Sequence, residues 1–395
     1  MTVKTKDWIM PALFLALPFA FMAPGLIWKS QLLFFIICPI FIIALNIKNV
    51  WVKAFLLYVA VWQIALLLLL FNFKDASIGP SLSILFSVMA GAIIYKFISE
   101  STIPDEKWHM VIRIAVITQI IIATPQHFGL NPFVWIVGMF TPIVEKLPGH
   151  LVGTLGNRNY LAAFIAFSVP FFVGWRTFNI GKWTINPSLI VIFIFLGFCL
   201  SPGTLAAIMG MGFLLSYKFS FMKRMVTWSA AMKVATAYAA AYILTTGYHL
   251  NEFQALPGQL REMWETGKIT LSPIQGDIGR FAMWMTAISQ LLSSWPAMIF
   301  GFGPAAAWGR EYPIHGQYVS VWFQYGLIGL TLMLGYICST IWFLNKGKHV
   351  ILLTAVIIIC LDMVANFPAE IATTSFMMLV ICGLIERERL RGGMR

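Results

Sequence analysis

The sequence predicts an all-α, polytopic membrane protein, and three observations support that fold class. Of the 395 residues, 59% are hydrophobic and only 11% are charged, with a mean hydropathy of +0.83. A soluble chain usually carries about 25% charged residues to cover its surface. Apolar runs of about 20 residues, the length that crosses a bilayer, recur along the whole chain. No internal repeat or soluble domain stands out, so residues 1–395 are expected to form one integral membrane domain.

About twelve membrane spans are expected from the hydropathy of the chain. They lie near residues 8–28, 31–47, 53–73, 80–99, 108–124, 159–176, 186–200, 203–219, 227–247, 318–344, 349–366 and 370–385. The apolar stretch 186–219 has two interpretations, because Ser201-Pro202-Gly203 forms either a tight turn between two spans or a break within one.

The distribution of basic residues predicts the orientation. Nineteen of the 27 Lys and Arg residues fall on the side that includes both termini. Because basic loops stay in the cytoplasm, both termini are expected to be cytoplasmic in a bacterial inner membrane. Two long loops, about 125–158 and 248–317, then lie on the periplasmic face. Short basic turns also suit anionic lipid head groups, and they do not indicate nucleic-acid binding.

The second long loop is predicted to hold an amphipathic helix at 280–295. On a helical wheel at about 100° per residue, one face collects Phe281, Trp284, Met285, Ile288, Leu291, Leu292 and Trp295. Such a helix lies at the bilayer interface and does not span it. Arg280 falls at its start, on the polar side, and Pro296 is expected to end it. Gly301-Phe302-Gly303-Pro304 then predicts a turn.

The predicted periplasmic face holds arginines and histidines, and its sequence contains no metal-ligand or serine-nucleophile motif. Arginine forks bind phosphate oxygens, and a histidine of near-neutral pKa exchanges protons with hydroxyls or leaving groups. Arg280 and His315 are therefore candidates for a site that acts on a phosphorylated lipid. Each has a structural alternative: Arg280 as a head-group contact, His315 as a loop residue. Asp362, inside an apolar run, is either functional or hydrogen-bonded to a neighbouring span.

Two separated motifs stand out. The first is Gly153-Thr154-Leu155-Gly156-Asn157-Arg158-Asn159-Tyr160-Leu161-Ala162, which leads into a mid-chain span. The second begins with Arg280 and Trp284, continues through Gly301-Phe302-Gly303 and His315, and closes with Tyr325-Gly326-Leu327-Ile328-Gly329. Together they resemble the O-antigen ligase and polymerase superfamily, whose members move glycans from undecaprenyl diphosphate at the outer face of the inner membrane. Two positions depart from that pattern: Gly316 where the family often has Asn, and Gln324 where it often has Glu.

The resemblance implies an inverting glycosyltransferase that needs no metal, nucleotide or other cofactor. Its donor would be an undecaprenyl-diphosphate-linked glycan, and its acceptor a hydroxyl of lipid A–core (ligase) or of another glycan (polymerase). Arg280 would hold the diphosphate and stabilise the leaving group, while His315 would act as the base or as a second phosphate ligand. The expected substrate-binding residues are Asn157, Arg158, Asn159, Trp284, Arg310 and Tyr318.

A transporter or flippase for a lipid-linked or amphipathic solute is the main alternative. Such a protein is expected to place charged groups within its spans, and Asp362 is the main acid there. Attachment of the glycan to protein is less expected, because relatives with that activity commonly carry a C-terminal soluble extension. A membrane subunit without activity has the weakest support.

Overall fold

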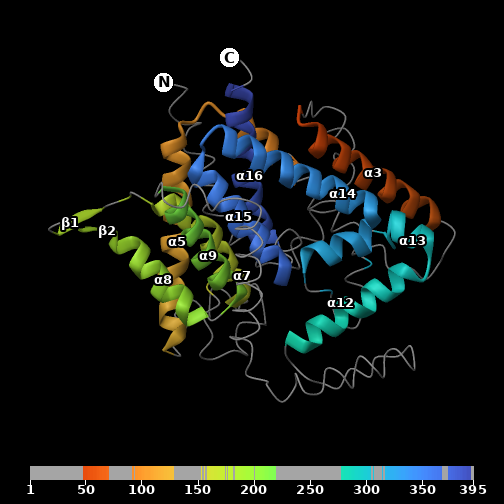
Figure 1. The fold of residues 1–395 in the computed structure, drawn as a ribbon, viewed down its shortest axis with the longest axis horizontal. Helices are drawn as coiled ribbons and strands as arrows, with labels where there is room; N and C mark the ends of the chain where they lie inside the picture. The colour runs from red at the N-terminus through yellow and green to blue at the C-terminus, as the bar shows by residue number, and fades with distance from the viewer. Residues whose placement is uncertain are drawn as a thin grey trace.

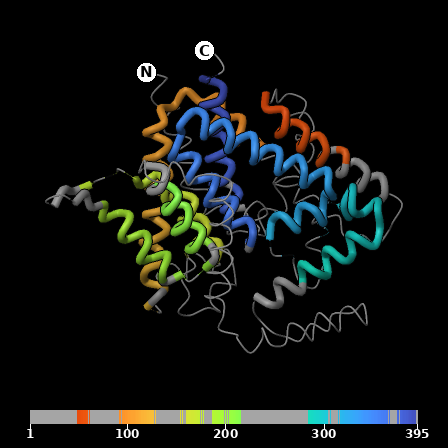
Figure 2. Tube along the Cα trace, in the orientation of Figure 1, coloured from red at the N-terminus to blue at the C-terminus, as the bar shows by residue number. Residues whose placement is uncertain are grey.

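The computed structural model describes residues 48–70, 91–128, 153–218 and 277–392, with short gaps inside the last three ranges. The spans expected near 8–28, 31–47 and 227–247 lie outside the described residues. Within the described residues the chain is mostly helical, as predicted. Two three-residue strands pair there as one short antiparallel hairpin. Figure 1 shows the arrangement, and Figure 2 follows the same course as a tube.

The helices fall close to the apolar runs of the sequence. They are α3 (Val50–Leu70), α5 (Asp105–His127), α7 (Arg158–Ser168), α8 (Pro187–Cys199), α9 (Pro202–Lys218), α12 (Asp277–Leu292), α13 (Trp295–Phe300), α14 (Gln317–Lys346), α15 (Val350–Ala365) and α16 (Ala372–Gly392). A 3₁₀ turn, η2 (Val169–Phe172), continues α7, and the strands are β1 (Phe178–Ile180) and β2 (Trp183–Ile185).

Two of the described helices, α5 and α14, are long and apolar enough to cross a membrane. Helices α3, α7, α8, α9 and α15 contain shorter apolar segments. By length and composition, the described residues thus hold two candidate membrane spans, a coarser result than the twelve expected. It also separates α8 from α9 at Ser201, so the stretch 186–219 forms two helices joined by a turn.

Helix α7 lies at the centre of the main core. Every residue from Leu161 to Phe172 is buried, because α5, α8, α9, α15 and α16 all pack around this segment. Its small side chains allow close approach: a Cβ on Gly203 at the start of α9 would lie 2.9 Å from the backbone nitrogen of Ala163. The first motif therefore leads directly into the most buried helix among those described.

One end of the helix bundle is held by a charged network. It joins the starts of α3 and α5, the turn between α14 and α15, and the end of α16 through Asn49, Asp105, His349, Glu386, Arg387, Glu388, Arg389 and Arg391. The Glu386 carboxylate accepts from Asn49 at 2.9 Å and pairs with Arg389 at 3.0 Å. Helix ends that are far apart in the sequence are therefore fixed to one another at this end.

Helix α14 is broken at Gly326, whose φ of 65° and ψ of −170° lie outside the helical region. A break of this kind releases carbonyl groups from the helical hydrogen-bond pattern. The Gly301–Gly303 turn supplies two donors, from Phe302 N to Phe323 O and from Gly303 N to Gln324 O, each at 2.9 Å. The Tyr58 hydroxyl of α3 donates to Tyr325 O, also at 2.9 Å. The glycine turn predicted from the sequence thus pairs with the last motif.

The pairing needs glycine on both sides. A Cβ on Gly326 would overlap the carbonyl oxygen of Ile299, and a Cβ on Gly301 would overlap the carbonyl of Gln324. Both residues also have positive φ, 65° and 80°, which side chains rarely adopt. The two backbones approach too closely for any other residue type.

Gly326→Ala is expected to destabilise the protein by about 2 kcal/mol or more, because strain and overlap add. Thermal unfolding of the purified protein in detergent measures the change. Gly197→Ala in α8 is the matched control, since nothing lies within 4 Å of the added methyl group. It is expected to leave the melting temperature unchanged or to raise it slightly. Equal melting temperatures for the two variants would contradict the steric account.

Candidate functional site

Helix α12 carries the candidate arginine. Arg280 lies in the first turn of α12, although its side chain lies outside the described residues. The predicted amphipathic helix is present, but it ends at Leu292 and not at Pro296. A second short helix, α13, begins at Trp295 with Pro296 in its first turn. Proline is favoured there because the first turn of a helix leaves its N–H groups unpaired in any case.

The buried face of α12 is narrower than the wheel predicts. Ala287 and Leu291 are fully buried against Phe323 of α14 and Ile314, while Leu292 and Trp295 are 60% and 67% exposed. Leu292 and Trp295 were assigned to the same apolar face, and the break after Leu292 removes Trp295 from that helix. Their exposed apolar surfaces suit the bilayer interface.

Trp284 meets the start of α14. A Cβ on Gly316, which precedes α14 with a φ of 108°, would lie 3.0 Å from Trp284 Nε1 and 3.0 Å from Val364 O. The Trp284 indole N–H is buried and has no hydrogen-bond partner among the described residues. The site therefore brings together α12, the start of α14 and the end of α15. Leaving a buried donor without a partner costs free energy, so an acceptor atom of a ligand would bind favourably at this position.

Each of the two candidate catalytic residues is close in sequence to one of the two residues in this contact. Arg280 precedes Trp284 by one helical turn of α12. His315 immediately precedes Gly316 but lies outside the described residues. Its other neighbour, Ile314, is 2% exposed.

Asp362 links α15 to the start of α14. It lies in the last turn of α15, where its Oδ1 accepts a hydrogen bond from Asn366 Nδ2 at 2.7 Å. The Asn366 carbonyl in turn accepts from Gln317 N at 2.8 Å. The carboxyl thus positions the first residue of α14, two residues after His315. Asn366 did not stand out in the sequence, although an Asp and an Asn four residues apart at a helix end are a recognisable pair.

The remaining predicted residues are placed as follows. Tyr318 is partly buried, and its hydroxyl donates to Cys360 O at 3.1 Å. Asn159 is half-buried in the first turn of α7. Asn157, Arg310 and the Arg158 side chain lie outside the described residues. Ahead of them, Gly153 turns with a φ of 55°, and its N–H donates to Gln126 Oε1 at 2.8 Å.

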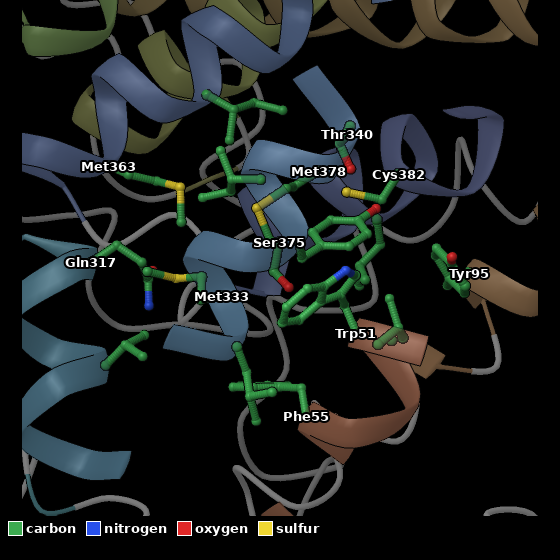
Figure 3. A pocket seen from close by; sticks show the side chains of 18 of the residues that line it. Trp51, Phe55, Tyr95, Gln317, Met333, Thr340, Met363, Ser375, Met378 and Cys382 are labelled. Carbon is green, nitrogen blue, oxygen red and sulfur yellow. The ribbon is translucent and has the colours of Figure 1, made fainter. Parts of the chain in front are cut away.

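A buried polar row runs along the first half of α14. Gln317, Ser320 and Gln324 are at most 2% exposed, and Gln324 Nε2 donates to Ser320 Oγ at 2.9 Å. Gln317 and Gln324 also line a cavity of about 630 Å³ between α3, α14, α15 and α16 (Figure 3). Among the described residues, no group of three His, Cys, Asp or Glu side chains could hold a metal ion.

Neither a protein-family model nor a curated protein matches this chain. The fold and the site define the class, a mostly helical protein with two helices able to cross a membrane.

Asp362→Ala should destabilise the protein by roughly 1.5–3 kcal/mol, because it leaves the buried Asn366 amide without its acceptor. Asp362→Asn retains an acceptor oxygen and is expected to lie within about 1 kcal/mol of the wild type. Melting temperatures in detergent compare the two variants. Equal losses in the two variants would show that the carboxyl charge, which both remove, matters more than the hydrogen bond, which only Asp362→Ala removes.

Proposed function

We propose that the protein is a glycosyltransferase that moves a glycan from undecaprenyl diphosphate to an acceptor hydroxyl at the periplasmic face of a bacterial inner membrane. The enzyme would act as an O-antigen ligase or repeat-unit polymerase. The observation that carries this proposal is the close contact between Trp284 and Gly316. A Cβ on Gly316 would lie 3.0 Å from Trp284 Nε1. This contact places the neighbours of Arg280 and His315 side by side, although they are far apart in the sequence.

The rest of the second motif supports the same proposal. The Gly301–Gly303 turn and the Tyr325–Gly329 segment pair at the break in α14, directly beside α13. The described segments of the second motif thus lie together around α13 and α14. The buried Trp284 indole N–H, which has no partner among the described residues, is a hydrogen-bond donor that a diphosphate would find at the start of α14.

In the proposed reaction, the acceptor hydroxyl attacks the anomeric carbon of the donor as the bond to the diphosphate breaks. Arg280 would hold the diphosphate through its guanidinium and stabilise the negative charge that grows on the leaving group. His315 would take the proton of the acceptor hydroxyl or act as a second phosphate ligand. Asp362 and Asn366 would act indirectly, by fixing the start of α14 next to His315.

The positions of the basic residues support the proposed orientation. The charged network lies where α5 starts and α14 and α16 end, whereas the Trp284–Gly316 junction lies where α14 starts and α15 ends. A candidate span therefore separates the network from the site. With the network in the cytoplasm, as the basic loops predict, the site would face the periplasm.

The transporter alternative relies on Asp362 as a charged group on a transport path. Asp362 contacts Asn366 and is absent from the residues that line the 630 Å³ cavity. The described structure therefore offers that alternative no charged group in the cavity wall.

Arg280→Ala and His315→Ala should each lower glycan transfer by at least about 100-fold, because each removes a group expected to act in the transition state. Arg280→Lys should recover only part of the activity, since an ammonium cannot replace a guanidinium fork. Gln290→Ala, on the exposed face of the same helix, is the matched control and should remain active. The assay follows glycan attachment or chain extension in cells, with the amount of protein in the membrane measured in parallel.

Wild-type glycan in both alanine variants, at normal protein levels, would overturn the transferase assignment. Loss of function in Asp362→Asn, at normal stability, with both alanine variants active would instead favour transport.

A further inference from the structure

The cavity beside α14 extends well beyond the candidate site. Its wall includes residues from Gln317 to Thr340 of α14, on both sides of the break at Gly326. The volume of about 630 Å³ is within the range of ligand-binding pockets. In Figure 3, Gln317 lies at one end of the cavity, while Thr340 and Cys382 lie at the other.

The end of the cavity farthest from Gln317 carries three hydroxyl groups, of Tyr95, Tyr336 and Thr340. All three are buried, and none has a hydrogen-bond partner among the described residues. Tyr95 and Thr340 are 3% and 1% exposed. Tyr336 and Thr340 are one helical turn apart on α14 and therefore leave the same face. We call these three groups the hydroxyl cluster.

The hydroxyl cluster is an unusual arrangement for an apolar cavity. Buried hydroxyls nearly always have a partner, because leaving one unsatisfied is costly. The Glu386 carboxylate lies beside the Tyr95 hydroxyl and the Cys382 thiol beside the Tyr336 hydroxyl, each near enough to interact with it but not in good hydrogen-bond geometry. Three hydroxyls at one end of an otherwise apolar cavity, with no well-aligned partner among the described residues, suit a hydrogen-bonding ligand.

We propose that the cavity binds a neutral lipid, whose long hydrocarbon chain lies along α3 and α14 and whose hydroxyl or ester group meets the hydroxyl cluster. Aromatic and aliphatic side chains form most of the wall, including Trp51, Phe55, Leu332, Met333 and Met378, so an apolar chain suits its length. Hydroxyls both donate and accept, as a lipid hydroxyl or ester requires.

The charges at this end of the cavity are already paired with one another. Glu386 and Arg389 both act on Tyr95, and the Glu386 carboxylate is paired with Arg389 at 3.0 Å and bonded to Asn49. A phosphate at the hydroxyl cluster would meet this committed ion pair, whereas an uncharged glycerol ester or long-chain alcohol needs no cation. The ligand is therefore distinct from the diphosphate-linked donor, whose head group would lie at the opposite end of α14.

The test uses the whole protein in phosphatidylcholine nanodiscs with a diacylglycerol probe that carries a photoreactive diazirine in one chain. Cross-linked peptides are expected from the cavity walls of α3, α14 and α16. The double variant Tyr336→Phe/Thr340→Val should lower labelling by about 10-fold, since it removes two hydrogen bonds and little volume. Ala92→Phe, which fills the cavity next to Tyr95, should also lower labelling while retaining the hydroxyl cluster.

Thr354→Val is the matched control. Thr354 is fully buried, but its hydroxyl donates to Val350 O at 2.8 Å and it does not line the cavity. Labelling of this variant should equal that of the wild type. Unlabelled diacylglycerol and hexadecanol serve as competitors. Competition by either one supports the proposal and distinguishes a glycerolipid from a simple alcohol.

Two results would overturn the proposal. One is equal labelling of the wild type and the double variant, or labelling confined to peptides outside the cavity. The other is stronger competition by phosphatidylglycerol or undecaprenyl phosphate than by the neutral lipids, which would assign the cavity to an anionic lipid. Because the readout is labelling, it is independent of whether the protein transfers glycans.

Discussion

The backbone pairing at the break in α14 is the constraint on which the rest of the described structure depends. A helix that crosses a membrane must keep its backbone groups hydrogen-bonded, because hydrocarbon offers them no partner. The break at Gly326 is tolerated because the Gly301–Gly303 turn and Tyr58 supply donors to the carbonyls beside it. The turn therefore cannot move without leaving those carbonyls unpaired. Through α13 and α12, this fixed turn also holds Trp284 against the start of α14.

Much of the helical arrangement was predictable, because hydropathy reports directly on apolar segments. The run at 318–344 appears as α14, and the run at 349–366 as α15. The break in α14 was not predictable from hydropathy, since Gly326 lies within an apolar run and a glycine alone does not fix a helix conformation. Gly301 and Gly303 in the turn were visible in the sequence, but only the structure shows that this turn packs against Gly326 at the break.

The candidate site was predictable to a different degree. Trp284, the Gly301–Gly303 turn and the Tyr325–Gly329 segment, which the second motif listed in chain order, lie around α13 and α14, while the role of the motif stays a prediction. Side-chain partners were less predictable: Asp362 resembled a mid-span acid, yet it lies at a helix end and contacts Asn366. A sequence shows the cost of a buried carboxyl but not which group compensates for it.

The Gly301–Gly303 turn also determines where the length of this chain is free to vary. Residues from Phe302 to Gln324 form a closed loop whose ends are joined by backbone hydrogen bonds. Any change in length between these ends must still return the chain to Ile314, which is buried against α12 and α14, and to Gly316 beside Trp284. Between Gln317 and Gly326, by contrast, a single inserted residue would rotate the helix by about 100°. Gln317 would then lose either its bond to Asn366 or its place in the cavity wall. The first turns of α14 are thus closed to any change in length.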